Sequence, residues 1–167
     1  MKNLKKAFGQ IYDQYVDKIY RFIFFKVSSQ EIAEDLCSET FIRGWQSFKE
    51  NNKEIKNPQA FLYKIARNLI IDYYREKSKV QFVSADCVSI DDPETNLEKQ
   101  SLDRSDIETI RTAIADLKDD YREIIILHYI NDLSIPEVAE TMGKTEGAVR
   151  VQLHRALKSL RNRIEQA

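Results

Sequence analysis

The chain has 167 residues and a formal net charge of −1, with four glycines and three prolines, so it can form one domain or two small ones. The near-zero charge excludes a protein that coats DNA along its whole length, and no segment approaches the roughly 20 apolar residues of a membrane span. Cys37 and Cys87 do not have the spacing of a metal or redox pair. With no apolar run behind the N-terminal lysines to form a signal peptide, we expect a cytoplasmic protein that contains one buried and one incidental thiol.

The first 77 residues show apolar side chains at helical spacing, which predicts three helices. We expect the first helix at about 4–27 and the second after Ser29, ending near 48. The third should begin at Pro58, with Asn57 as its N-cap, and end near 77. Strand-like alternation is limited to the short stretch 80–83. The composition therefore predicts an all-α protein.

The middle of the chain is polar and acidic from about 78 to 105, with a helix-breaking Asp91-Asp92-Pro93. Such a stretch is long for a loop inside a compact domain, which favours a flexible acidic linker at 80–105 between domains at 1–79 and 106–167. Basic residues instead dominate the stretch 141–167. This segregation of charge suggests a DNA-binding C-terminal end and a connector that avoids DNA.

The C-terminal domain is expected to contain four helices, at about 106–117, 119–130, 134–142 and 145–164. Ser134 and Glu137 have the spacing of a capping box, and Gly143 can supply the left-handed residue that ends the third of these helices. Thr145 can then cap the last one. A short helix, a tight turn and a longer cationic helix form the pattern of a helix-turn-helix, whose second helix reads the major groove.

The last helix separates its residues into two faces. An apolar stripe should pack inward and consists of Val149, Leu153, Ala156, Leu157, Leu160 and Ile164. The candidate DNA contacts lie at the start of the helix or opposite the stripe and are Thr145, Gly147, Arg150, Val151, His154, Arg155 and Lys158. A basic face that is merely solvated is the competing interpretation, which the capped helix and glycine turn beside it disfavour.

Two further blocks, 31–45 and 60–75, resemble domain 2 of sigma factors, and the block 134–160 resembles their domain 4. The two motifs, in this order, resemble the extracytoplasmic-function (ECF) group of the sigma-70 family over nearly the whole chain except the linker. The resemblance implies two small helical domains, a sigma domain 2 bundle of three to four helices and a sigma domain 4 helix-turn-helix, joined by a flexible linker. Val151 and Gln152 depart from the small polar and basic residues that family members often carry there.

The resemblance also implies a transcription initiation factor that has no catalysis, cofactor or metal of its own and no membrane insertion. Its expected partners are bacterial core RNA polymerase, promoter DNA and an anti-sigma factor. The candidate helix-turn-helix contacts named above would then read the −35 element. The expected polymerase-binding residues lie on the second helix: Glu34, Asp35, Leu36, Glu39, Thr40 and Phe41.

The third helix presents a cationic, amide-bearing edge, which suits single-stranded DNA. The preceding loop, 50–57, resembles the loop with which the family captures an extruded −10 base, and Phe48 and Tyr63 flank it as stacking or core residues. The expected −10 contacts are Lys56, Asn57, Lys64, Arg67, Asn68, Asp72 and Arg75.

Two other functions are less consistent with the residues. An ordinary repressor with a helix-turn-helix would need a dimer and a palindromic site, and the block 31–75 favours the sigma interpretation over it. An enzyme is disfavoured because His128 and His154 have no partner at metal or triad spacing and there is no glycine-rich phosphate loop.

Overall fold

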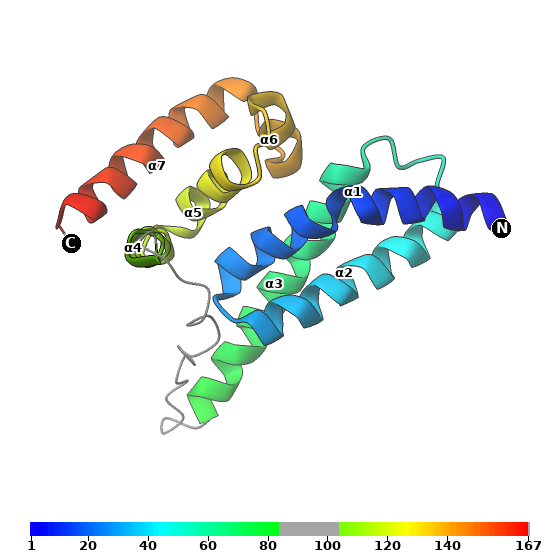
Figure 1. Cartoon of the computed structure of the whole chain (residues 1–167), viewed down its shortest axis with the longest axis horizontal. Coiled ribbons are helices and arrows are strands. Elements are labelled where there is room, and N and C mark those ends of the chain that lie inside the picture. Colours follow the sequence, from blue (N-terminus) through cyan, green and yellow to red (C-terminus); the bar gives the residue numbers. More distant parts are fainter. Residues whose placement is uncertain (84–103, 167) are drawn as a thin grey trace. The chain divides into compact units, whose positions relative to one another are not determined.

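The computed structural model describes residues 1–83 and 104–166, and every regular element in these ranges is helical (Figure 1). The chain divides into two compact units, Met1–Asp91 and Asp92–Ala167. None of the helices described is long and apolar enough to cross a membrane. The expectations for Cys87 and for most of the acidic linker fall on residues outside the described ranges.

The first unit is a bundle of α1 (Lys2–Val27), α2 (Gln30–Asn51) and α3 (Pro58–Val83), in which each helix contacts the other two. Ser28 adopts a left-handed conformation, with φ of 56°, and ends α1. The Ile32 amide donates to Ser29 Oγ at 3.4 Å and begins α2, while the Ala60 amide donates to Asn57 Oδ1 at 3.1 Å and begins α3. These contacts confirm the expected start of α2 after Ser29 and the expected Asn57 cap of α3.

Helix α3 continues beyond its expected end near residue 77 and includes residues 80–83, so the strand-like alternation of that stretch lies within a helix. A strand needs a neighbouring strand to satisfy its backbone groups, and no strand occurs among the residues described. Continuing the helix satisfies the same backbone groups locally. Residues 80–83, which were expected at the start of the linker, therefore belong to α3.

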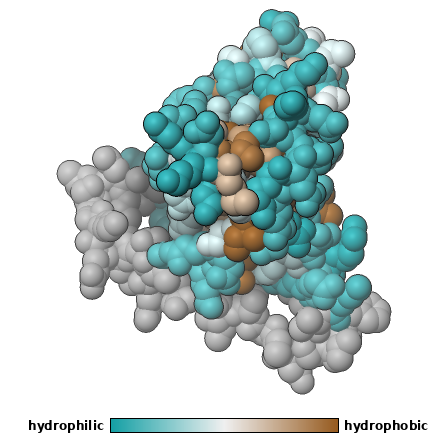
Figure 2. Space-filling model, turned by 90° about the vertical axis from the view of Figure 1, so that its right-hand side faces the viewer, coloured by the Kyte–Doolittle hydropathy of each residue, from teal (hydrophilic) through white to brown (hydrophobic). Residues whose placement is uncertain are grey.

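The core of the first unit is rich in aromatic rings. Phe22 and Tyr63 are fully buried and meet edge to face, with ring centroids 5.2 Å apart. Near the start of α1, Phe8 contacts three aromatic rings of α2, those of Phe41, Trp45 and Phe48. The side of the molecule on which α1 begins shows a narrow strip of hydrophobic residues between hydrophilic ones (Figure 2).

The second unit contains α4 (Arg104–Ala115), α5 (Asp119–Ile125), α6 (Ile135–Met142) and α7 (Glu146–Gln166). Helix α7 contacts all three of the others. The expected α-helix at 119–130 is wrong in its last turn, where Ile126–Ile130 forms a π-helical segment. There the Asn131 amide donates to the Ile126 carbonyl at 2.9 Å, and His128 Nδ1 lies 2.8 Å from the Leu133 carbonyl oxygen. The hydrogen bond from Asn131 to Ile126 spans five residues, which is the spacing of a π-helix. The His128 contact joins this segment to the loop that follows it.

Candidate nucleic-acid interface

The helix-turn-helix of the second unit is held by local hydrogen bonds. The Glu137 amide donates to Ser134 Oγ at 3.3 Å and the Ser134 amide donates to Glu137 Oε1 at 3.5 Å, which confirms the capping box. Gly143 has a φ of 66° and ends α6 in the left-handed conformation that glycine adopts without steric cost. The Ala148 amide then donates to Thr145 Oγ1 at 3.1 Å, which confirms Thr145 as the cap of α7.

Packing of α7 decides which of its residues face solvent. Val149, Leu153 and Ala156 are buried, as the apolar stripe predicts, while Leu157 and Leu160 are half-buried. Ile164, near the end of the stripe, is exposed and therefore contributes little to the core. All the candidate −35 residues are exposed: Thr145, Gly147, Arg150, Val151, His154, Arg155 and Lys158.

Two polar contacts organise the exposed surface around the start of α7. Arg150 Nη2 lies 3.5 Å from Glu146 Oε2, and Lys144 Nζ donates to Gln152 Oε1 at 2.6 Å. Both pairs are exposed, so each contributes at most about 1 kcal/mol to folding. A capped first helix, a left-handed glycine and an exposed cationic second helix together define a DNA-binding protein of the helix-turn-helix class.

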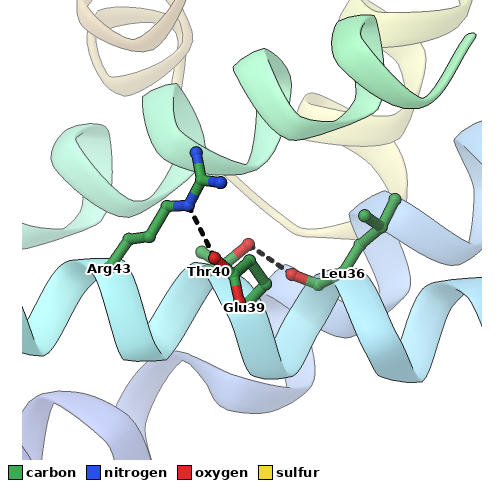
Figure 3. A network of polar contacts seen from close by, with 4 residues as sticks. All are labelled: Leu36, Glu39, Thr40 and Arg43. Atoms are coloured by element: carbon green, nitrogen blue, oxygen red, sulfur yellow. Dashed lines mark hydrogen bonds and ion pairs between the residues drawn. The ribbon is translucent and has the colours of Figure 1, made fainter. Parts of the chain in front are cut away.

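Helix α2 carries a second set of candidate residues, of which Figure 3 shows Leu36, Glu39 and Thr40. Glu34 and Asp35 are exposed, and Leu36 and Glu39 are half-buried. Glu39 Oε1 accepts a hydrogen bond from Arg43 Nε at 2.7 Å, an i, i+4 ion pair along the helix. Sequence reasoning did not single out Ile42, a large apolar residue exposed on the same helix.

Thr40 and Phe41 cannot form part of that surface, because both are buried. Thr40 Oγ1 donates to the Leu36 carbonyl at 2.7 Å (Figure 3), and the Phe41 ring packs edge to face on Tyr12, with centroids 4.8 Å apart. The expectation that these two residues contact polymerase is therefore corrected. The contacts with α1 set the rotation of α2, and this rotation turns positions 40 and 41 inward.

Burial favours the neutral forms of two ionisable side chains near this surface, those of Cys37 and Tyr20. Burial, followed by the nearby Asp17 carboxylate, raises the pKa of the Cys37 thiol to about 11. Burial also raises the pKa of Tyr20, with further contributions from Glu34 and Cys37. The Cys37 thiol is thus the buried, unreactive thiol expected from the sequence.

The outer edge of α3 carries most of the candidate −10 residues. Lys64, Asn68, Asp72 and Arg75 are exposed and Arg67 is half-buried. Asp72 Oδ1 and Arg75 Nη1 lie 3.8 Å apart, a loose pair that leaves the guanidinium accessible. In the preceding loop Lys56 is exposed.

Two aromatic residues beside that loop, Phe48 and Tyr63, are core residues rather than stacking partners for a base. The half-buried Asn57 uses its side-chain oxygen to cap α3. Sequence reasoning missed Ile71 and Tyr74, which are exposed on α3. Their apolar character was visible in the sequence, but their exposure depends on how α3 is rotated in the bundle.

Comparison with known proteins relates each of the two units to a region of sigma-70 factors. A model of sigma-70 region 2 matches residues 11–80 and a model of sigma-70 region 4 matches residues 107–160. The ECF RNA polymerase sigma factor SigW of Bacillus subtilis is 33% identical, over 98% of this chain and 94% of SigW. The ECF RNA polymerase sigma factor BldN of Streptomyces coelicolor is 32% identical over 92% of this chain, which spans 59% of the length of BldN.

Solved structures show the same fold. The sigma factor RpoE from Bartonella quintana, determined in complex with the anti-sigma factor NepR, has a TM-score of 0.78 at 23% identity, covering 96% of this chain and 98% of RpoE. CnrH, determined with the cytosolic domain of CnrY, has a TM-score of 0.70 at 20% identity, covering 97% of this chain and 90% of CnrH. The chain belongs to the ECF group of the sigma-70 family of RNA polymerase sigma factors. It is thus a transcription factor that directs core RNA polymerase to promoters with −10 and −35 elements.

Proposed function

We propose that α7 recognises the −35 element in the major groove, with Arg150, His154 and Arg155 as its principal polar contacts. The observation that carries this assignment is the burial of Val149, Leu153 and Ala156, which leaves the cationic face of the same helix exposed. Arg150 lies in the first turns of α7, where helix-turn-helix proteins usually meet base edges. Lys158 lies further along and is assigned to phosphate.

Transcription by reconstituted holoenzyme on a promoter library tests this assignment. Arg150→Ala should relax the preference at one or two −35 positions, because a bidentate arginine contact is worth roughly 1–3 kcal/mol of base discrimination. Lys158→Ala is the matched charge control and should reduce the salt slope of promoter binding by about one without changing the preference. An unchanged −35 preference in Arg150→Ala would show that α7 is oriented differently on DNA.

We propose that the −10 element is bound by α3 and the loop before it. The exposed edge of α3 places cationic and amide side chains side by side, which supports binding of an unpaired strand. The proposed contacts are Lys56, Lys64, Arg67, Asn68, Asp72 and Arg75. Asn57 is proposed to act indirectly, because its side chain caps α3 and thereby positions the loop.

Core polymerase is proposed to dock on α2 through Glu34, Asp35, Leu36 and Glu39. The two exposed carboxylates on successive positions and the half-buried Leu36 beside them support this surface. Thr40 and Phe41 support it from within the core and do not belong to it.

The remaining proposals follow from the family. Region 2 is proposed to extend from the N-terminus to the end of α3 and region 4 from α4 onwards. We propose that the chain acts in the cytoplasm, where RNA polymerase is found, and that it carries out no chemistry itself. An anti-sigma factor is proposed as a regulatory partner, by analogy with RpoE, which has the same fold and was determined in complex with the anti-sigma factor NepR.

A further inference from the structure

We infer that Val151 determines specificity for the −35 element by contacting the 5-methyl group of a thymine in the major groove. This inference rests on the proposed function of α7 and names the chemical group that one of its residues reads. Val151 stands out because it is the one large apolar residue on the exposed DNA-facing side of α7, where its neighbours are polar, cationic or small residues such as Gly147 and Ala148. Its side chain is 51% exposed, whereas Val149, two positions earlier, is fully buried.

The position of Val151 on the helix follows from helical geometry. Successive residues rotate by about 100° around an α-helix, so Val151 lies about 200° from the buried Val149. Gly147 and Lys158, at four residues before and seven after, share this outermost line. Burying the apolar stripe of α7 therefore places Val151 at the centre of the surface that meets DNA.

The surroundings of Val151 leave its methyl groups open to a ligand. Gly147, one turn earlier, has no side chain of its own, and a Cβ added there would meet no atom within 4 Å, so the space beside Gly147 on the way to Val151 is open. Its neighbours are polar groups engaged elsewhere, since Arg150 pairs with Glu146 and Gln152 accepts from Lys144. Because Gly147 has no side chain, the backbone at the start of α7 can come close to DNA, and the short side chain of Val151 can then reach a base edge.

The chemistry of the major groove supplies an apolar partner. Phosphates and most base edges offer hydrogen-bonding atoms, which a valine cannot use, while thymine presents a methyl group at its C5 position. Guanine, cytosine and adenine present no such group in the groove. A valine at the centre of the reading surface therefore selects thymine and disfavours the other bases at one position, on either strand.

Replacing thymine by deoxyuridine in the promoter tests the inference, because it removes the methyl group and preserves base pairing. Each thymine of the preferred −35 element, on both strands, is replaced in turn, and transcription by holoenzyme containing the full chain is measured. Deoxyuridine at one position should lower transcription about fourfold, the effect of removing one buried methyl-sized group. With Val151→Ala the loss at that position should fall below twofold, since the two changes remove the same contact.

A matched control removes apolar atoms from a similarly exposed residue that lies outside α7. Ile110, on α4, is 44% exposed, and Ile110→Ala should retain the full deoxyuridine effect. Circular dichroism checks that both variants fold. The inference is overturned if no deoxyuridine lowers transcription, if the sensitive position responds equally in Val151→Ala, or if the preferred −35 element contains no thymine. Failure of the proposed function looks different, because then Arg150→Ala leaves the −35 preference unchanged.

Discussion

Glu146 and Arg150 lie one helical turn apart on the exposed face of α7, with Oε2 and Nη2 separated by 3.5 Å. The pair places a carboxylate at the helix N-terminus, where it interacts favourably with the helix dipole, and it holds Arg150, a proposed DNA contact, beside an anion. To make the proposed contact, Arg150 must exchange this partner for a base edge or a phosphate. Glu146 is therefore expected to stabilise the free protein and to oppose DNA binding.

Glu146→Gln should raise promoter affinity at low salt, because it frees Arg150 and removes a negative charge close to phosphates. The gain should not exceed about fivefold, since an exposed charge interaction is worth up to about 1 kcal/mol. The free energy of unfolding should fall by less than about 1 kcal/mol. Glu165→Gln makes the same charge change at the other end of α7 and should leave affinity nearly constant; equal effects of the two variants would contradict the role of Glu146.

Charge reversal on α2 separates the proposed polymerase surface from its supporting core. Asp35→Lys and Glu39→Lys should weaken holoenzyme formation while circular dichroism stays helical, because both side chains lie on the outside of the helix. Thr40→Val should instead lower the free energy of unfolding by roughly 1 kcal/mol, since the hydroxyl group that donates to Leu36 is lost. Its affinity for core polymerase should not change. Native core affinity in both charge reversals would exclude this face of α2.

Base contacts and phosphate contacts to the −10 element can be distinguished by how the effect of a mutation on transcription depends on the −10 sequence. Asn68→Ala should cost more transcription on the preferred −10 sequence than on altered sequences, because an amide can read base edges. Arg75→Ala should weaken all sequences about equally, because phosphate contacts carry little sequence information. Transcription on a −10 library measures both effects. Identical sequence profiles for the wild type and Asn68→Ala would remove Asn68 from the reading residues.

The buried thiol of Cys37 should make stability depend on alkaline pH. Its folded pKa is about 11, above the ordinary value of 9.0, so the folded chain keeps the proton over a range in which the unfolded chain loses it. The stabilising effect is complete below about pH 9 and declines as pH rises towards 11. Urea unfolding in a Cys87→Ser background should show a steeper loss of stability over this range than Cys37→Ala in the same background. If the free energy of unfolding depends on pH in the same way with and without Cys37, the raised pKa of the Cys37 thiol is contradicted.

Labelling of Cys37 by a thiol reagent offers a second measurement of the same burial. At pH 8 the reaction should be far slower in the folded Cys87→Ser protein than after unfolding in urea, because the reactive thiolate is disfavoured and the residue is buried. Rapid labelling of the folded protein would show that the first unit opens easily around Cys37.

The caps were predictable because each is made within about four residues. Ser134 with Glu137, Thr145 and Asn57 form hydrogen bonds to amides three positions later, so that their spacing in the sequence suffices to identify them. Gly143 was identifiable for the same reason, since the left-handed end of α6 is a local property of the backbone. The spacing of apolar residues likewise predicted which face of α7 is buried.

Residues 40, 41 and 63 show what the spacing could not decide. Helix α2 carries apolar residues around much of its circumference, so the side that turns inward depends on its contacts with Phe8 and Tyr12 of α1. Tyr63 was compatible with a base-stacking site until packing against Phe22 placed its ring in the core. These contacts join residues more than twenty positions apart, and local patterns contain no information about them.

The sequence by itself determined the helical composition, the capping signals and the order of two motifs that identify the family, because all of these depend on residue type and short spacing. Only the tertiary structure decided that Thr40 and Phe41 are internal, that the 119–130 segment ends in a π-helical turn and that residues 80–83 are helical. It also showed that Val151 is exposed. An apolar residue can be proposed as a DNA contact only when the packing of its helix is known to leave it facing solvent. The physical reason is common to these cases: burial is a property of long-range packing, which selects among several rotations that the local sequence allows.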